Sequence, residues 1–273
     1  MMKYISPGSW FSLEYPDNWC EAEEAEDCFL FYNPEKWNGN FRISAYQGEN
    51  RNYAKDCMAD ELRHTSGSKP VKVGAWDCVY FAEAFNEEGI DYVSHIWITG
   101  CGSISVECSF TVRKGDSPKP GEDIVASLRV RQPDEKPWHD VIPVRVLEIN
   151  TINEGYDWAV STLKKQLSKD FTAHETDIAN LQRMVDEGKF KPGNRQAWEN
   201  FGIAFGTILV NEMDGMDWVT VIDGKKEYPA LRFADTRLMV YPVSLIWNKV
   251  SRGEPCDLKA EYLRIRREAE AVI

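Results

Sequence analysis

The stretch Arg131-Gln132-Pro133-Asp134-Glu135-Lys136-Pro137-Trp138 separates two patterns of apolar residues that differ in period. Before this stretch the apolar residues mostly alternate with polar ones, as in strands. After it they mostly recur every three or four residues, as in helices. The 273 residues also exceed the usual size of one hydrophobic core. The sequence therefore predicts two domains, over residues 1–130 and 144–273, joined by a proline-rich linker over residues 131–143.

The first half has its clearest alternation over residues 103–112, where every second residue is apolar. This pattern predicts an antiparallel strand with one face on a core and the other in water. Further strands are predicted over residues 11–15, 28–32, 41–46, 76–81 and 92–99, and helices over residues 52–63 and 121–128. Asn86-Glu87-Glu88-Gly89 is predicted to close a hairpin. The first domain is therefore expected to be an antiparallel sheet with helices packed on it, an α+β fold.

The second half combines helical periodicity with a short run of strands. Thr151 and Thr172 are each followed three residues later by a glutamate, the capping-box spacing, so both are predicted to begin helices. A third helix carries Gly202 and Gly206, four residues apart, where another element is expected to approach closely. Later segments are predicted as a β-meander over residues 218–222, 228–233 and 238–241, followed by helices over residues 242–250 and 257–270. This half is also expected to be a small α+β domain.

Charge and hydropathy exclude two classes of partner. The net charge is −12, from 44 acidic against 32 basic residues, so nucleic acid would be repelled. The dense basic cluster of Arg264, Arg266 and Arg267 is interleaved with glutamates and is interpreted as a solvated helix face. No apolar run is long enough to span a membrane, and the N-terminus lacks the apolar stretch of a signal peptide. The sequence predicts a soluble, cytoplasmic protein.

The seven cysteines argue against a metal or redox motif, because their number is odd and no two form a C-x-x-C pair. Free thiols in a reducing compartment are expected, and no cofactor is predicted. Cys78 or Cys108 could pair with His95 as a nucleophile and base. Both cysteines lie on apolar strand faces, however, so the preferred interpretation is that they are buried and inert.

Acidic residues supply the remaining candidate sites. Those considered for acid–base or Mg²⁺ chemistry are Glu199, Glu212, Asp214, Asp217, Asp223 and Asp235. Chance clustering and roles in turns account for them, so no catalytic or metal site is predicted. A dense acidic run follows Trp19, and its charged residues are candidate interaction residues for a basic partner: Glu21, Glu23, Glu24, Glu26 and Asp27. The preferred interpretation of this run is a solvated loop, because like charges that lie close together must stay in water.

Two segments resemble known families. Residues 10–19, Trp-Phe-Ser-Leu-Glu-Tyr-Pro-Asp-Asn-Trp, are similar to the first strand of PsbP-like domains, in which a proline ends the strand and a tryptophan folds back over the sheet. Residues 198–206, with Asp217-Trp218 and Tyr241-Pro242, resemble the C-terminal domain of bacterial two-domain proteins of unknown function. The resemblance implies a PsbP-like first half and an uncharacterised α+β second half. PsbP-like domains are mostly binding modules, which implies a binding role and no activity.

The first functional hypothesis is therefore a protein-interaction module without catalytic activity, which binds an unidentified protein partner. It rests on the resemblance, on the ten tryptophans and on the lack of a catalytic constellation. Aromatic side chains that the core does not use are typical anchors of interfaces. One alternative is an immunity protein or chaperone in bacterial competition or secretion, whose acidic charge would attract a basic toxin. The other is a small-ligand-binding protein or enzyme with a site in the cleft between the domains.

Overall fold

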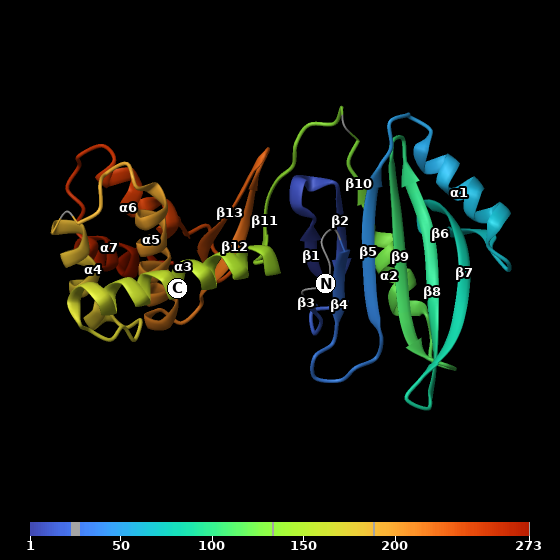
Figure 1. The fold of residues 1–273 in the computed structure, drawn as a ribbon, viewed down its shortest axis with the longest axis horizontal. Coiled ribbons are helices and arrows are strands. Elements are labelled where there is room, and N and C mark those ends of the chain that lie inside the picture. Colours follow the sequence, from blue (N-terminus) through green and yellow to red (C-terminus); the bar gives the residue numbers. More distant parts are fainter. Residues whose placement is uncertain (23–27, 133, 188, 273) are drawn as a thin grey trace. The chain divides into compact units, whose positions relative to one another are not determined.

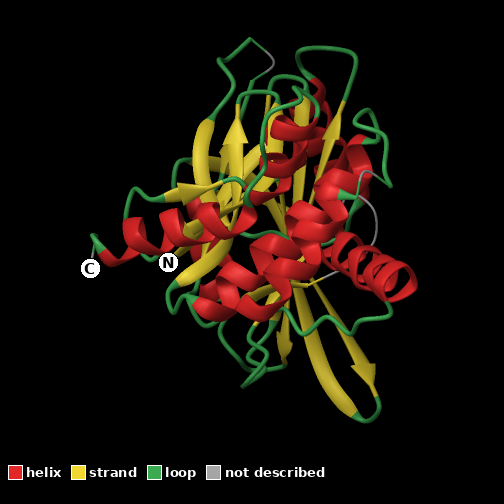
Figure 2. Cartoon of the chain, turned by 90° about the vertical axis from the view of Figure 1, so that its left-hand side faces the viewer, coloured by secondary structure: helices red, strands yellow, loops and turns green. Residues whose placement is uncertain are grey.

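The computed structural model describes residues 1–22, 28–132, 134–187 and 189–272. The chain divides into two compact units, Met1–Trp138 and His139–Ile273, each with its own hydrophobic core. Both units combine helices with antiparallel strands (Figure 1 and Figure 2), which confirms the prediction of two α+β domains. Residues 139–143, which the sequence places in the linker, form a strand of the second unit because they pair along their whole length with residues 219–223.

The first unit contains a seven-stranded and a three-stranded antiparallel sheet. Its strands are β1 (Met2–Ile5), β2 (Phe11–Tyr15), β3 (Cys20–Ala22), β4 (Cys28–Tyr32), β5 (Asn40–Gln47), β6 (Lys69–Val73), β7 (Trp76–Glu87), β8 (Ile90–Cys101), β9 (Ile104–Arg113) and β10 (Arg129–Val130). Its helices are α1 (Tyr53–His64) and α2 (Lys119–Ser127), with a 3₁₀ turn at Pro7–Ser9. The large sheet has the order β3-β4-β5-β9-β8-β7-β6, and the small sheet has the order β1-β2-β10.

The two faces of the large sheet are covered differently. On the inner face the main core includes Phe110 on β9, Ile124 on α2 and Phe11 on the small sheet. Trp19 follows the proline that ends β2 and lies back over the sheet, as the resemblance to PsbP-like domains implies; it stacks on the ring of Phe110 with centroids 6.0 Å apart. On the outer face a smaller cluster centred on Ile96 packs against Met58 of α1. The helices cover only part of each face, so parts of the sheet remain open on both sides.

The second unit places helices around a four-stranded sheet with the order β11-β12-β13-β14. Its strands are β11 (His139–Pro143), β12 (Met216–Asp223), β13 (Lys226–Phe233) and β14 (Met239–Val240). Its helices are α3 (Val146–Leu167), α4 (Ile178–Asp186), α5 (Arg195–Glu212), α6 (Pro242–Val250) and α7 (Leu258–Glu270), with a 3₁₀ turn at Glu175–Asp177. The apolar face of α5 lies at the centre of the core.

Both predicted capping boxes in this unit are wrong. Thr151 lies inside α3, where its hydroxyl donates to the Leu147 carbonyl at 3.1 Å, because the helix begins directly after β11. Thr172 donates through its N–H and its hydroxyl to Asp177, at 2.7 and 3.0 Å. The turn before α4 is therefore held by Asp177, two residues beyond the glutamate of the predicted box.

Candidate functional site

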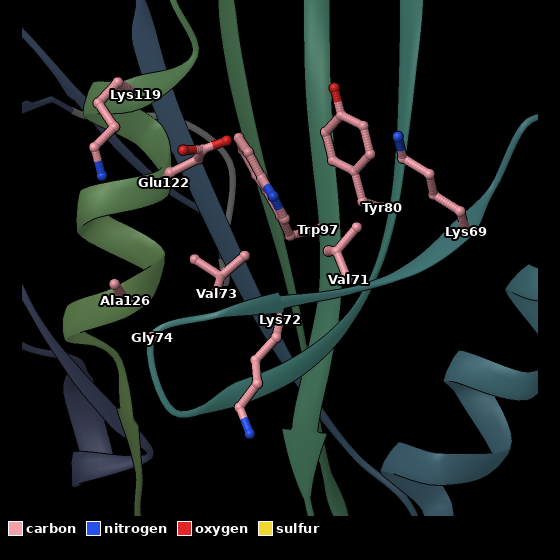
Figure 3. Close-up of a pocket in the computed structure, with 10 residues that line it drawn as sticks. All are labelled: Lys69, Val71, Lys72, Val73, Gly74, Tyr80, Trp97, Lys119, Glu122 and Ala126. Atoms are coloured by element: carbon pink, nitrogen blue, oxygen red, sulfur yellow. The ribbon is translucent and has the colours of Figure 1, made fainter.

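The first unit has a pocket at the edge of the large sheet, beside α2 (Figure 3). Its volume is about 430 Å³, and we call it the α2 pocket. The residues that line it are Lys69, Val71, Lys72, Val73, Gly74, Tyr80, Trp97, Lys119, Glu122 and Ala126. It forms where the inner faces of β6, β7 and β8 extend past the helix. The volume lies in the range of about 300 to 1,000 Å³ that is usual for small-molecule sites.

Two rings from neighbouring strands line the α2 pocket, and a third ring lies beside them. The ladder of β7 and β8 places Tyr80 opposite Trp97, with ring centroids 5.7 Å apart. His95 lies next to both, and its Nδ1 is 2.8 Å from the Tyr80 hydroxyl. Burial lowers the pKa of His95, which favours the neutral imidazole, and the direction of its hydrogen bond with the Tyr80 hydroxyl is set by the tautomer. Burial likewise raises the pKa of Tyr80, which keeps that hydroxyl protonated.

Charged side chains stand on opposite sides of these rings (Figure 3). On the side of β6, the Lys69 ammonium lies over the Tyr80 ring, 5.5 Å from its centroid. On the side of α2, Glu122 points toward Trp97, and Lys119 forms an ion pair of 2.5 Å with Asp123. Within the described part of the chain, Lys69 has no carboxylate partner. Among the described residues that line the α2 pocket, Lys69 and Lys72 are cations without an ion pair, and Lys69 is the one that lies over a ring. The Glu122 carboxylate stands across the rings from it.

The opposite face of the sheet carries an exposed group of rings, the aromatic surface, formed by Trp37, Phe85 and Tyr92. Tyr92 contacts Trp37 edge to face at 5.8 Å and Phe85 by stacking at 5.5 Å. Trp37 and Phe85 are 40% and 42% exposed. The rings line a second hollow of about 390 Å³ together with Asn40, Arg42, Glu87, Ser94 and Thr111. Of the ten tryptophans, all of them in described residues, Trp37 and Trp158 are the exposed ones.

Local structure explains how Trp37 reaches this surface. The Asn33 side-chain oxygen accepts from the N–H groups of Glu35 and Lys36 at 2.9 and 3.1 Å, which fixes the turn before Trp37. Gly39 then adopts a φ of +118°, and a Cβ there would lie 2.5 Å from the Phe110 ring. The turn is therefore held at both ends, and the indole is presented on a rigid loop.

The family comparison identifies both halves of the chain. A family described as "Domain of unknown function (DUF3805)" matches residues 1–153, and one described as "Domain of unknown function (DUF3806)" matches residues 177–262. The chain belongs to the DUF3805 family. The expected pairing of two uncharacterised domains is thereby confirmed. No protein of curated function matches the DUF3805 chain.

Three solved structures are similar to the DUF3805 chain. A crystal structure from Bacteroides thetaiotaomicron VPI-5482 is 47% identical and covers 96% of this chain and 97% of its own, with a TM-score of 0.92. Cyanobacterial PsbP from Synechocystis sp. PCC 6803 is 12% identical and covers 47% of this chain and 91% of its own, with a TM-score of 0.27. LpqN, involved in cell envelope biogenesis of Mycobacterium tuberculosis, is 12% identical and covers 46% and 87%, with a TM-score of 0.31.

The acidic run considered as a candidate partner site lies mostly outside the described residues. Glu23, Glu24, Glu26 and Asp27 belong to the segment 23–27, of which nothing is described. Glu21 is half-buried in β3, opposite Phe31 of β4. A different acidic segment of the DUF3805 chain is described and exposed, at the tip of the β7–β8 hairpin over residues 82–91.

The thiols considered as nucleophiles are both buried, with Cys78 3% and Cys108 0% exposed. Burial raises the pKa of the Cys78 thiol and raises that of Cys108 well above its ordinary value. His95 hydrogen-bonds to Tyr80, and Cys108 lies opposite Trp97 in the sheet. The geometry therefore favours the interpretation that these cysteines fill the core.

A thiol-labelling experiment checks this interpretation. Cys101 is exposed, so we expect a thiol reagent added to the native DUF3805 protein to modify Cys101 quickly. Cys78 and Cys108 should react only after denaturant is added, because the reagent and the thiolate both require solvent access. Peptide mass spectrometry at successive times reads each position. Rapid labelling of Cys108 in the folded protein would restore the nucleophile alternative.

The six candidate carboxylates of the second unit do not converge. Glu199 pairs with Arg195 at 2.7 Å along α5, and Glu212 lies 3.0 Å from Nδ1 of His174. The hairpin turn places Asp223 within 3.0 Å of His139, and Asp235 lies 3.4 Å from Arg232. Asp214 and Asp217 flank the turn between α5 and β12. Among the described residues, no group of three His, Cys, Asp or Glu could hold a metal ion.

A buried polar cluster that sequence reasoning missed lies at the start of α3. Arg145 is 2% exposed and donates to Glu148 from Nε and Nη2, at 2.8 and 2.5 Å. Nη2 also donates to Glu227 on β13 at 2.8 Å, and the Thr220 hydroxyl on β12 donates to Glu148 at 2.9 Å. Burial alone would lower the pKa of Arg145, but its hydrogen bonds to Glu148 and Glu227 raise it overall. The cluster joins α3 to two strands, so its role is structural.

Among the described residues, no helix of the DUF3805 chain is long and apolar enough to cross a membrane.

Proposed function

We propose that the DUF3805 chain is a protein-binding module that acts without a catalytic step and contacts its partner through the aromatic surface. The observation that carries the proposal is the exposure of Trp37 and Phe85 around Tyr92 on a rigid face of the sheet. Large rings that are held in place lose little conformational entropy when they are covered, and they dominate the binding energy of many interfaces. The hollow beside the rings, which Asn40, Ser94 and Thr111 also line, gives room for a side chain of the partner.

The charge beside the aromatic surface indicates the chemistry of that partner. The hairpin tip over residues 82–91 contains four acidic residues, Glu83, Glu87, Glu88 and Asp91, and no basic one. Lys114 lies 3.8 Å from Asp91, and no cation of the described residues pairs with the other three. Acidic side chains on one side of the aromatic surface favour a partner that carries lysine or arginine at that place. We therefore propose a basic protein partner.

The test compares two exposed aromatic residues, Trp37 in the loop before β5 and Tyr46 on β5. The tagged, full-length protein is used to capture partners from its native cells, and the captured protein is purified and titrated against variants. Trp37→Ala should weaken binding about 30-fold or more, because it removes the proposed anchor. Tyr46→Ala is the control, since Tyr46 is 48% exposed on β5 and does not line the hollow. Circular dichroism confirms that both variants are folded.

Two outcomes would contradict the proposal. A partner that binds the Trp37 and Tyr46 variants with equal affinity contacts another surface. Failure to capture any stoichiometric partner under mild lysis would count against a protein-binding role altogether. A second variant tests the role of charge. Replacing Glu87 and Glu88 by glutamine should lower the rate constant for association with the partner and make this rate constant less dependent on ionic strength.

A narrower form of the proposal is an immunity protein or chaperone for a basic toxin in bacterial competition. The acidic hairpin tip favours it, because electrostatic attraction speeds the capture of a basic target. In that case a toxin gene would lie beside this one, and neutralising the tip would reduce protection. We place the protein in the cytoplasm, where its seven free cysteines would stay reduced.

A further inference from the structure

We infer that the α2 pocket binds a small carboxylate that carries a flat apolar body and a hydrogen-bond donor. This site is separate from the aromatic surface: the pocket opens on the face of the sheet that α2 covers, and the aromatic surface is on the opposite face. The inference therefore does not depend on the proposed protein partner. It rests on the shape, the rings and the distribution of charge in the pocket.

The floor of the α2 pocket suits a flat apolar group. Val71 and Val73 of β6 and Ala126 of α2 line it beside the rings of Tyr80 and Trp97 (Figure 3). Trp97 is only 1% exposed and forms the closed bottom, whereas Tyr80 is half-buried and offers more of its ring. Aromatic groups prefer offset or edge contacts with such rings. A ligand ring inserted here would replace water over the exposed part of Tyr80 and over the valine side chains of β6.

The cation at one end selects a carboxylate. Lys69 extends across the Tyr80 ring, so its ammonium is held at the pocket before any ligand arrives. A carboxylate placed there would form a charge-assisted hydrogen bond without breaking an existing ion pair. Lys119 is less suited, because it already pairs with Asp123. Lys72 extends away from the rings (Figure 3), as expected from the alternation of side chains along β6.

The carboxylate of Glu122 adds a second requirement at the other end. It points toward Trp97 from α2, across the rings from Lys69 (Figure 3). A ligand without a donor at this place would remove water from the Glu122 carboxylate and form no hydrogen bond to it, so the desolvation would weaken binding. An N–H or O–H on the flat body, on the side away from the ligand's carboxylate, would satisfy it. The two charged groups therefore define both the class and the orientation of the ligand.

Three probes separate these requirements. Indole-3-acetate has the flat body, the carboxylate and the N–H; indole lacks the carboxylate; and 1-methylindole-3-acetate lacks the N–H. Calorimetric titration of the full-length protein should show saturable binding of indole-3-acetate with a dissociation constant of about 1 mM or below. Each of the other two probes should bind about tenfold more weakly.

Matched variants locate the binding. Lys69→Gln should weaken indole-3-acetate binding about tenfold, whereas Lys55→Gln, on α1 at the opposite face of the sheet, should leave it unchanged. Glu122→Ala should abolish the preference for indole-3-acetate over its N-methyl form. The inference is overturned if indole-3-acetate does not saturate at about ten times the expected constant, or if Lys69→Gln binds it as the wild type does. Because none of these residues belongs to the aromatic surface, partner binding by the same variants should be unchanged.

Discussion

Replacing Arg145 by methionine is expected to lower the free energy of unfolding of the second unit by about 3 to 5 kcal/mol. The guanidinium is buried between Glu148 and Glu227, and it donates to both. Without it, the carboxylates of Glu148 and Glu227 would both lose the guanidinium that they share in a buried site. Methionine fills a similar volume. Most of the loss in unfolding free energy therefore comes from carboxylates that stay buried without the guanidinium, and little of it comes from a cavity.

Hydrogen exchange read peptide by peptide is the appropriate measurement, because two units with separate cores need not unfold together. Amides of α3, β12 and β13 should exchange faster, while those of the first unit keep their protection. Arg195→Met is the control. The Arg195 side chain is exposed in its ion pair with Glu199, so this replacement should lower the free energy of unfolding by at most about 0.5 kcal/mol.

A second test adds Glu148→Leu and Glu227→Leu to the Arg145 variant. This triple replacement should recover stability, because no charge remains buried. A loss below about 1 kcal/mol for Arg145→Met alone would show that water reaches the cluster.

Gly202→Ala is expected to destabilise the second unit by about 1 to 3 kcal/mol, although alanine favours a helix by about 1 kcal/mol over glycine. A Cβ at this position of α5 would lie 2.3 Å from the Pro242 carbonyl oxygen and 2.8 Å from that of Val243. Both atoms belong to the backbone at the start of α6, which cannot rotate away as a side chain could. The two helices would have to separate, which would open the core around them.

The control for this prediction is Gly193→Ala, which precedes the same helix. A Cβ there meets nothing within 4 Å, so the stability should change little or rise slightly. Thermal and urea unfolding of the two variants, followed in parallel with the wild type, gives the comparison. If Gly202→Ala proved as stable as the control, α6 would have to move away from α5 at negligible cost, and the close packing described here would be wrong.

The sequence predicts the strands best where one face is buried. Residues 11–15 and 28–32 are strands to the residue, because their alternation follows a core on one side. β7 extends six residues past its predicted end, to Glu87, because the hairpin tip is exposed on both faces and no alternation is required there. β6 was not predicted. It contains two lysines and a proline, which are typical of a strand at a sheet edge, so its sequence lacks the run of apolar residues that indicates a strand.

The sites were less predictable than the fold, since they depend on pairing between strands. Tyr80, His95 and Trp97 come together because the ladder sets Tyr80 opposite Trp97, and a slip by one residue would send them to different faces. The sequence shows ten tryptophans but cannot tell that Trp37 is held outside by an Asn33 turn while Trp97 closes a pocket. The Arg145 cluster was missed for the same reason, because its acceptors lie 3 and 82 residues away.

The position of the boundary between the units decides how the chain can be divided into fragments. The DUF3805 match ends at residue 153, whereas the structure separates after Trp138. A fragment of residues 1–153 would therefore end with β11 and the first residues of α3 but without β12, the strand that pairs with β11. Ile142, which is buried in the whole chain, would be exposed. The complementary fragment, which lacks β11, would leave the backbone N–H and C=O groups on one edge of β12 unpaired, and such an edge promotes aggregation. A cut after Trp138 keeps every described strand with the strands that pair with it. The segment that the family model matches, residues 1–153, is therefore longer than the unit that has its own core, Met1–Trp138.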